Sequence, residues 1–226
     1  MRTFVIGDIH GCFYTLNYLL FDLCKITKRD KIILLGDYID RGPFIKETID
    51  LIINLIDTEY DIVPLRGNHE QLLIESLDTP KMLINWMKNG GESTLNSFMV
   101  INPLFLEDKY INFFLNTKYY HLEQDFICVH AGLNFSLDDP FSDKKAMLTQ
   151  RVSNVNLTKT LGRRLIVGHT PKNLNEIRTS LYSDTIRLDG GCVYHKKVST
   201  LGNLVALELN EMQLFYAKNI EEEKML

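Results

Sequence analysis

Five short apolar runs in this chain each lead into residues that can bind a metal ion. The side chains concerned are carboxylates, imidazoles and one amide, namely Asp8, His10, Asp37, Asn68, His130 and His169. Oxygen and nitrogen donors suit Mn²⁺, Fe, Zn²⁺ or Mg²⁺, whereas a structural zinc site would use mainly cysteine thiolates. Six such groups are too many for one catalytic ion that keeps a position open. The set therefore predicts two divalent ions that share one carboxylate.

Two ions held in this way would suit phosphate chemistry. Paired metals about 3.5–4 Å apart clamp a phosphoryl group and generate hydroxide from water at neutral pH. Two divalent ions with the carboxylates of Asp8 and Asp37 leave a local charge of about +2. Arg41 and Arg66 each stand beside a ligand, and guanidinium groups bind phosphate oxygens in bidentate fashion. These residues predict the hydrolysis of a phosphate ester.

The elements that must position these ligands are buried strands. Each apolar run is rich in branched residues and bounded by Gly or Pro, which is typical of such strands; we expect them at residues 4–6, 32–35, 62–65, 126–129 and 165–167. Leucines at i, i+3, i+4 and i+7 from Leu16 to Leu23 predict a helix after the first strand. Because strand and helix alternate, an α/β layer arrangement is indicated, and the carboxyl ends of its strands open into one crevice.

The second half of the chain differs in pattern. Apolar runs at 185–188, 204–209 and 212–216 predict strands of a second, antiparallel sheet packed on the first, with a hairpin turn at Asn210. Residues 79–120 carry no strand pattern and are expected to form a helical insertion. The acidic tail, residues 221–224, is expected to fray. We therefore expect one domain over residues 1–226.

Composition excludes several classes of protein. The chain has 226 residues, 45% of them hydrophobic and 24% charged, and a net charge of −4. These values favour a globular protein without a broad basic surface, so nucleic acid is not an expected partner. The four cysteines, Cys12, Cys24, Cys128 and Cys192, are widely spaced, which favours reduced thiols in a cytoplasmic protein. No apolar run is long enough to span a bilayer, so a membrane partner is not expected.

Each motif taken alone has an ordinary structural explanation. A single Asp-x-His or Asn-His beside glycine is more often a turn, and one histidine at a strand end is more often only hydrogen-bonded. Five such motifs in one order, each at the end of a predicted strand, are hard to attribute to chance.

The motif series resembles that of the phosphoprotein phosphatases, a family of calcineurin-like metallophosphoesterases. The motifs are Gly-Asp-Ile-His-Gly at 7–11, Gly-Asp-Tyr-Ile-Asp-Arg-Gly at 36–42, Gly-Asn-His-Glu at 67–70, His-Ala-Gly at 130–132 and Gly-His at 168–169. Arg66 and the Asn-Gly-Gly at 89–91, after Trp86, make the chain similar to the compact bacterial and phage lambda-type members. The resemblance runs from residue 4 to about residue 209. It implies a four-layer α-β-β-α sandwich.

The resemblance also implies roles for the residues. Asp8 and His10 would bind the first metal, Asp37 would bridge, and Asn68, His130 and His169 would bind the second. We expect Mn²⁺, with Fe and Zn²⁺ as alternatives. His69 would be the general acid that protonates the leaving oxygen, oriented by Asp40, while a hydroxide that bridges the two metals attacks in line. Arg41 and Arg66 would hold the phosphate.

A third phosphate-binding arginine is expected in such a family before the last histidine. Arg151 is the candidate, and a solvent-exposed structural arginine is the alternative reading. The Ser-Ala-Pro-Asn-Tyr-Cys motif of the eukaryotic enzymes is missing; Gly-Gly-Cys-Val-Tyr at 190–194 stands near its place.

The leading functional prediction is a serine/threonine protein phosphatase that acts on a phosphoprotein or phosphopeptide, with phosphotyrosine as a further candidate. The alternative within the same fold is a symmetrical diadenosine tetraphosphate hydrolase. A nucleic-acid phosphodiesterase is disfavoured by the lack of a basic stripe. A metal-free binding scaffold is disfavoured because all six ligands, together with His69 and Asp40, are present.

Overall fold

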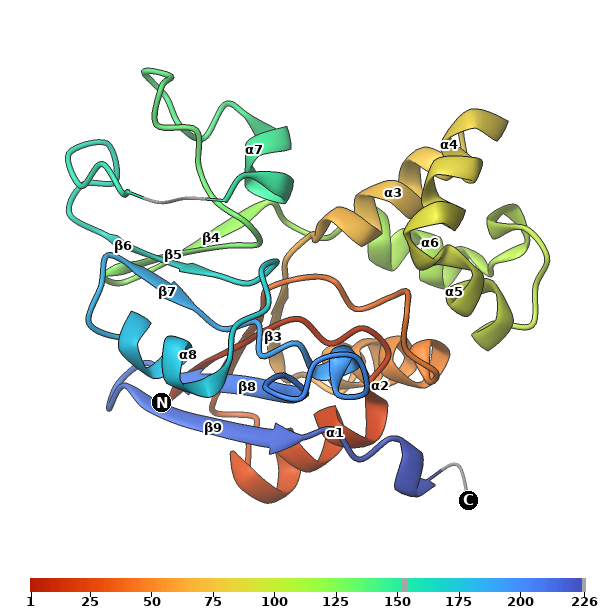
Figure 1. Ribbon diagram of the computed structural model, residues 1–226, viewed down its shortest axis with the longest axis horizontal. Helices are drawn as coiled ribbons and strands as arrows, with labels where there is room; N and C mark the ends of the chain where they lie inside the picture. The colour runs from red at the N-terminus through yellow and green to blue at the C-terminus, as the bar shows by residue number, and fades with distance from the viewer. Residues whose placement is uncertain (152–153, 225–226) are drawn as a thin grey trace.

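Two β-sheets lie face to face at the centre of the computed structural model, which describes residues 1–151 and 154–224 (Figure 1). The five-stranded sheet has the order β3 (Asp61–Pro64), β2 (Lys31–Leu34), β1 (Thr3–Ile6), β8 (Asn203–Glu208) and β9 (Gln213–Lys218). The four-stranded sheet has the order β4 (Tyr120–Glu123), β5 (Phe126–Val129), β6 (Arg164–Val167) and β7 (Thr185–Arg187).

The five strands predicted before the ligand motifs are all present. Strands β1, β2 and β3 run parallel in the first sheet, and β5, β6 and β7 run parallel in the second. Parallel strands end at the same edge of a sheet, so the loops that follow them emerge together.

The alternation of side chains along the strands divides the core into layers. Val5, Ile33 and Val205 point between the sheets and pack against Cys128 and Ile166 of the second sheet. The other face of β1 and β2 packs on helices, and the outer face of β5 and β6 packs on residues that include Met147 of α7 (Lys144–Thr149). The order of layers is therefore helix, sheet, sheet and a thin outer layer of helix and loop, which confirms the predicted mixed α/β sandwich.

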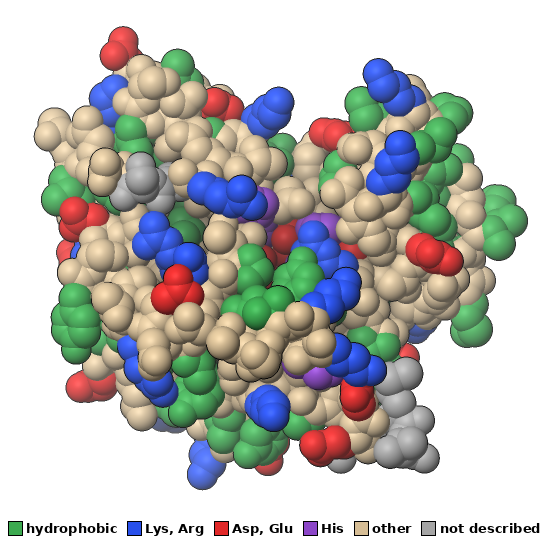
Figure 2. Space-filling view, in the orientation of Figure 1, with side chains coloured by type: hydrophobic (Ala, Val, Ile, Leu, Met, Phe, Trp, Pro, Cys, Tyr) green, Lys and Arg blue, Asp and Glu red, His purple; other side chains and the backbone are tan. Residues whose placement is uncertain are grey.

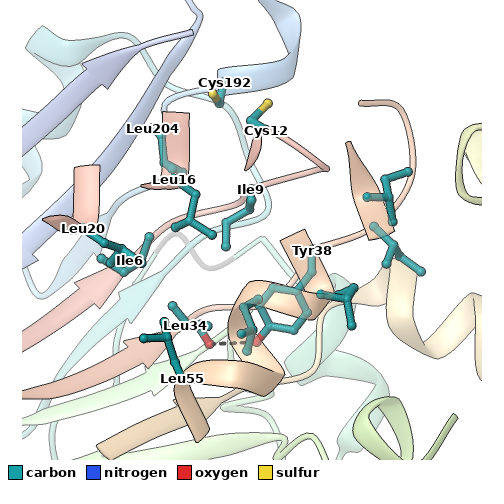
Figure 3. Packing of buried hydrophobic residues seen from close by; sticks show 14 of the residues in the cluster. Ile6, Ile9, Cys12, Leu16, Leu20, Leu34, Tyr38, Leu55, Cys192 and Leu204 are labelled. Carbon is teal, nitrogen blue, oxygen red and sulfur yellow. Dashed lines mark hydrogen bonds between the residues drawn. The ribbon is translucent and has the colours of Figure 1, made fainter. Parts of the chain in front are cut away.

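Helices α1 (Phe13–Tyr18) and α2 (Ile45–Asp57) cover the outer face of the first sheet, and a π-helical turn (Leu19–Leu23) extends α1. Figure 3 shows Leu20 beside Ile6 and Leu16 beside Ile9, with the Tyr38 hydroxyl donating to the Leu34 carbonyl oxygen. Helix α8 (Leu174–Ser180) packs beside β7. In the described part of the chain, no helix combines the length and the apolar character needed to cross a membrane.

A lobe of helices stands beside the two sheets (Figure 1). It contains α3 (Asn68–Ser76), α4 (Pro80–Trp86), a π-helical turn (Met87–Gly91), α5 (Glu92–Ser97), a 3-10 turn (Pro103–Phe105) and α6 (Asp108–Leu115). Helices thus occupy most of residues 79–120. The chain then returns to the second sheet as β4, which begins at Tyr120 and has no pronounced apolar pattern.

The prediction that the C-terminal strands form their own antiparallel sheet is wrong. Strand β7 pairs in parallel with β6, whereas β8 pairs antiparallel with β1 and then with β9. Both faces of β8 are buried, because Val205 and Leu207 point between the sheets while Leu204 and Ala206 point toward the helices. A strand buried on both faces occupies the interior of a sheet, so β8 lies between β1 and β9, and β9 and β3 form the two edges of the five-stranded sheet.

The prediction of a frayed tail is also wrong for its first residue. The side chain of Glu221 is buried and its carboxylate accepts hydrogen bonds from the backbone N–H groups of Tyr14 and Thr15 and from the Thr15 hydroxyl. These three hydrogen bonds replace the ones that water would make to the carboxylate. They anchor this part of the tail to α1.

All four cysteines are free and buried, as the sequence predicts. The thiols of Cys12 and Cys192 lie side by side (Figure 3). The side-chain amide of Asn219 contacts both sulfur atoms. These contacts join the loop after β1 to the segment before β8.

Asp30 fixes the start of β1 against the start of β2. Its carboxylate accepts hydrogen bonds from the Arg2 guanidinium at 2.7 and 3.1 Å, and from the backbone and hydroxyl of Thr27. The Arg2 guanidinium, with the help of Thr27, lowers the pKa of Asp30 to about 2. This clamp helps to hold the register in which Ile6 lies opposite Leu34, so that the loops carrying Asp8 and Asp37 leave the sheet together.

Asp30→Asn should lower the free energy of unfolding at pH 7 by about 1–2 kcal/mol, because the folded carboxylate is stabilised relative to the unfolded one. A lowered folded pKa gives stability above the unfolded pKa that is lost as the pH falls. Urea titrations of parent and variant should therefore converge between about pH 4 and pH 2. Asp22→Asn, at an exposed carboxylate, is the control and should differ from the parent by less than about 0.5 kcal/mol. If the free energy of unfolding of Asp30→Asn stays below that of the parent by the same amount down to pH 3, this account is contradicted.

Candidate metal centre

The loops at the carboxyl ends of five strands meet in a cleft between the helical lobe and the sheets. In the first sheet, Asp8 and His10 follow β1, Asp37 and Asp40 follow β2, and Asn68 and His69 follow β3. In the second sheet, His130 follows β5 and His169 follows β6. In Figure 2, histidine and acidic side chains line the floor of this cleft, and Lys and Arg side chains flank it.

The backbone of these loops is strained. Positive φ angles occur at His10 (48°), Asp37 (54°), Asp40 (69°), Arg41 (72°) and His169 (66°). Residues with a Cβ seldom adopt this region, and such strain is concentrated at functional sites. Gly67 permits the close approach, because a Cβ there would collide with the carboxylate and backbone nitrogen of Asp37.

Two histidines are held in a single tautomer by the backbone. Nδ1 of His10 donates a hydrogen bond to the Ile39 carbonyl at 2.7 Å, and Nδ1 of His130 donates to the Leu35 carbonyl at 2.9 Å. Each ring therefore presents the lone pair of Nε2 to the cleft. A histidine oriented by a backbone carbonyl in this way is typical of metal ligands.

The carboxylate of Asp37 is the common point of the site. Its Oδ2 lies 3.6 Å from Nε2 of His10, 3.5 Å from Nε2 of His130 and 4.0 Å from Nε2 of His69. Two groups share this carboxylate, each with ligand atoms within 4.8 Å of one another: His10, Asp37 and His69, and Asp37, His130 and His169.

Asn68 belongs to the second group. Its Oδ1 lies 3.1 Å from Nε2 of His130 and 2.8 Å from Nδ1 of His169. Amide oxygen, imidazole nitrogen and carboxylate oxygen thus converge on one side of Asp37, which is a donor set suited to a divalent cation.

Asp8 lies beside the second group and outside both clusters in this arrangement. Its two carboxylate oxygens accept the backbone N–H of His169 at 3.1 and 3.0 Å. Asp8 belongs to neither group of ligand atoms within 4.8 Å, so its pairing with His10 at one ion stays a prediction. His69 takes that place beside His10, with a ring separation of 4.9 Å.

Burial sets the charge state of the imidazoles. It lowers the pKa of His10 to about 3 and that of His169 to about 4, and it lowers the pKa of His130. These rings are neutral at pH 7, which is the form that binds a metal. Burial alone would raise the pKa of Asp37, but the imidazoles of His130, His69 and His10 outweigh it and lower that pKa.

His69 differs from the other rings. Its Nδ1 lies 2.6 Å from Oδ2 of Asp40, and both side chains are buried. Burial opposes protonation, but the carboxylates of Asp37 and Asp40 outweigh it and raise the pKa of His69. A protonated, oriented imidazole beside the cluster can act as a proton donor.

The three predicted phosphate-binding arginines lie in different surroundings. Nη1 of Arg41 donates to Nε2 of His10 at 2.7 Å, and Nε of exposed Arg151 donates to the hydroxyl of Thr170, next to His169, at 3.3 Å. Arg66 is buried and donates to side chains and carbonyls of the helical lobe and the segment after it: Thr117, Gln71, Tyr119, Phe114 and Leu115. These acceptors satisfy its N–H groups, so in this arrangement Arg66 anchors the lobe.

Two buried carboxylates of the site were not predicted. Glu70 accepts the backbone N–H groups of Gly67, Asp37 and Tyr38, all at 2.8 Å, and joins the loops after β2 and β3. Asp189 follows β7, and burial raises its pKa to about 7. Asp189 and Asp37 add to burial in raising the pKa of Asp8. An apolar run that ends in Asp-Gly-Gly at 189–191 is the same signal that marks Asp8, and it could have identified Asp189.

Comparison with known sequences gives two groups of relatives. The chain is 34% identical over 91 residues to serine/threonine-protein phosphatase 1 of Salmonella typhimurium, an alignment covering 40% of this chain and 39% of that protein. It is 28% identical over 141 residues to the symmetrical bis(5'-nucleosyl)-tetraphosphatase of Psychromonas ingrahamii, covering 59% and 45% respectively. The matched segments thus span less than half of either relative.

Comparison with solved structures supports the fold. A crystal structure described as a putative diadenosine tetraphosphatase superimposes with a TM-score of 0.62 at 17% identity, covering 96% of this chain and 93% of that one. The family model described as calcineurin-like phosphoesterase matches residues 1–201. The resemblance seen in the motifs is confirmed, and the chain belongs to the calcineurin-like metallophosphoesterase family.

Proposed function

We propose that this chain hydrolyses phosphate monoesters with two divalent ions and that its substrates are phosphoserine and phosphothreonine in proteins. The observation that carries the proposal is the convergence of imidazole and amide donors on the Asp37 carboxylate, with His69 and Arg41 beside them. A metallophosphoesterase needs ligands, a proton donor and a cation for the phosphate at one place.

The residues present fit a pair of ions. Asp37 would be shared; His10 would complete one site, with Asp8 moving to join it, while Asn68, His130 and His169 would complete the other. Bound there, divalent ions would supply Lewis-acid charge for the phosphate and a nucleophile from water. The donors suit Mn²⁺ first, with Fe and Zn²⁺ as alternatives.

The protein supplies the proton and the orientation of the substrate. His69, held by Asp40, would protonate the departing oxygen of a serine or threonine, which leaves poorly as an alkoxide. Arg41 and Arg151 flank the cluster and would bind the phosphate oxygens that face the cleft. Arg66 would take part only if its bonds to the helical lobe were released.

Two features support a protein substrate. A groove of about 540 Å³ opens beside Asn68 between α3 and α7, and a second of about 530 Å³ opens beside Arg41. A site with a groove on each side can accept an extended chain with the phosphorylated residue at its centre. Alignments to serine/threonine phosphatases of Salmonella typhimurium and Escherichia coli, at 34% and 35% identity, point the same way. The four free, buried cysteines support a cytoplasmic location.

A symmetrical diadenosine tetraphosphate hydrolase is the second candidate. Several relatives carry that name, including one from Buchnera aphidicola that is 39% identical over 114 residues. The two grooves could also receive the two halves of a dinucleotide.

Metal removal should abolish activity reversibly. Protein stripped with a chelator should bind two Mn²⁺ per chain, measured by elemental analysis, and should regain hydrolysis of p-nitrophenyl phosphate. Asp37→Asn, which removes the shared charge, should bind fewer ions and stay inactive. If none of Mn²⁺, Fe²⁺ and Zn²⁺ restores hydrolysis, the proposal that this chain is a metal-dependent phosphatase is wrong.

His69→Asn should lower kcat for a phosphoserine peptide by roughly 10²–10⁴-fold, because the proton donor is lost. Its metal content should stay at the parent value. His121→Asn, at a partly exposed histidine of β4, is the matched control and should leave both unchanged. Loss of metal from His69→Asn would make His69 a ligand, in keeping with its 4.0 Å approach to Asp37.

Substrate class is tested by competition. A phosphoserine/phosphothreonine peptide, a phosphotyrosine peptide and diadenosine tetraphosphate are mixed at equal concentration and their products followed by mass spectrometry. The proposal expects the phosphoserine/phosphothreonine peptide to be consumed first. Preference for the dinucleotide would replace the proposal with its alternative.

A further inference from the structure

Helices α4 and α5 of the helical lobe reach the catalytic cluster through the buried carboxylate of Asp40. Trp86, at the end of α4, donates its indole N–H to Asp40 at 2.9 Å (Oδ2) and 3.1 Å (Oδ1). Thr94, in α5, donates its hydroxyl to Oδ1 of Asp40 at 2.6 Å and accepts the backbone N–H of Asp40 at 3.1 Å. Trp86, Thr94 and Asp40 are fully buried.

These bonds determine where the Asp40 carboxylate can point. Oδ1 accepts the Thr94 hydroxyl, and the Trp86 N–H is shared between the two oxygens, so the carboxylate is held with Oδ2 at 2.6 Å from Nδ1 of His69. Asp40 itself has a positive φ of 69°, a conformation that a residue with a side chain keeps only when its surroundings impose it. The two donors from the lobe supply that constraint.

The turn between the two donors brings them to the carboxylate. Gly90 has a φ of 110°, and a Cβ at Gly91 would lie 2.6 Å from the Trp86 ring. The chain can therefore fold back over the indole, so that α5 places Thr94 on the same carboxylate as Trp86. This explains why an Asn-Gly-Gly turn follows the tryptophan.

We propose that Trp86 and Thr94 are positioning residues for proton donation to the leaving group. They would act on His69 only through Asp40, and the inference rests on the proposed role of His69 as the acid. A displaced acid matters most when the leaving oxygen is a poor leaving group. An alkoxide from serine needs the proton, whereas p-nitrophenolate is a stable anion and leaves without it. The effect of losing either donor should therefore depend on the leaving group.

The test compares two substrates in conservative variants. Trp86→Phe removes the N–H and keeps most of the ring, and Thr94→Val removes the hydroxyl and keeps the shape. Each should lower kcat for a phosphoserine peptide by about 10–100-fold, the value of a hydrogen bond to a charged group. Hydrolysis of p-nitrophenyl phosphate should fall less than about 3-fold, with KM and metal content unchanged. Thr94→Ser, which keeps the hydroxyl that Thr94→Val removes, should retain activity on the peptide.

A double variant separates positioning from general stability. In the His69→Asn background, Trp86→Phe should cause no further loss on the peptide, because residues that act through one group are not additive. Equal losses on both substrates, or an undiminished further loss in the double variant, would overturn the inference. If His69→Asn instead lowers kcat equally for both substrates while metal-dependent hydrolysis persists, that result would show that His69 is not the acid, whatever Trp86 and Thr94 do.

Discussion

The buried carboxylate of Asp37 is the interaction on which the rest of the site depends. A carboxylate removed from water is stable only if it is paired or hydrogen-bonded. Here one oxygen faces the imidazoles of His10, His69 and His130, which follow β1, β3 and β5, and the other accepts the backbone N–H of His69 at 3.0 Å. Loops from both sheets are thus joined at a single side chain. The strained backbone of the loop after β2 follows from this requirement, because Asp37 must turn back toward neighbours on both sides.

The two-sheet architecture serves this convergence. Strands β1 to β3 and β5 to β7 direct their carboxyl ends to the same side of the molecule, while the apolar layer between the sheets fixes their separation. Glu70 then ties the second loop to the third, and the Asp30 clamp helps to keep the first two strands in register. The helical lobe contributes in a different way. Its first helix, α3, begins with Asn68 and His69, and its later part binds Arg66 and, through Trp86 and Thr94, the partner of His69.

Much of this could be predicted from the sequence because the signals are local. An interior strand needs a short run of branched residues, and the ligand stands directly after it, as at Asp37 and His130. The sheets to which β7 and β8 belong could not be predicted in the same way. Alternating apolar residues indicate that a strand is buried, but they do not say which of two sheets buries each face. Glu221 was misjudged for a related reason, since a charged residue in a tail gives no sign of the donors that will surround it.

The geometry also sharpens the division of roles within the motifs. His69 and Asp8 appear in the sequence as an acid and a ligand; in the structure His69 belongs to one of the two groups around Asp37, whereas Asp8 accepts the backbone N–H of His169. The imidazoles of His10 and His130 each present a lone pair to the cleft, and with Asn68 and His169 beside them the donors are suited to two ions that share Asp37.

The central claim is that Asp37 is shared by two ions. Electron paramagnetic resonance of the Mn²⁺-loaded protein tests it most directly, because two Mn²⁺ ions joined by a carboxylate are magnetically coupled. The account predicts a coupled spectrum at two ions per chain that is lost in Asp37→Asn. A spectrum of isolated Mn²⁺ at every loading would contradict it.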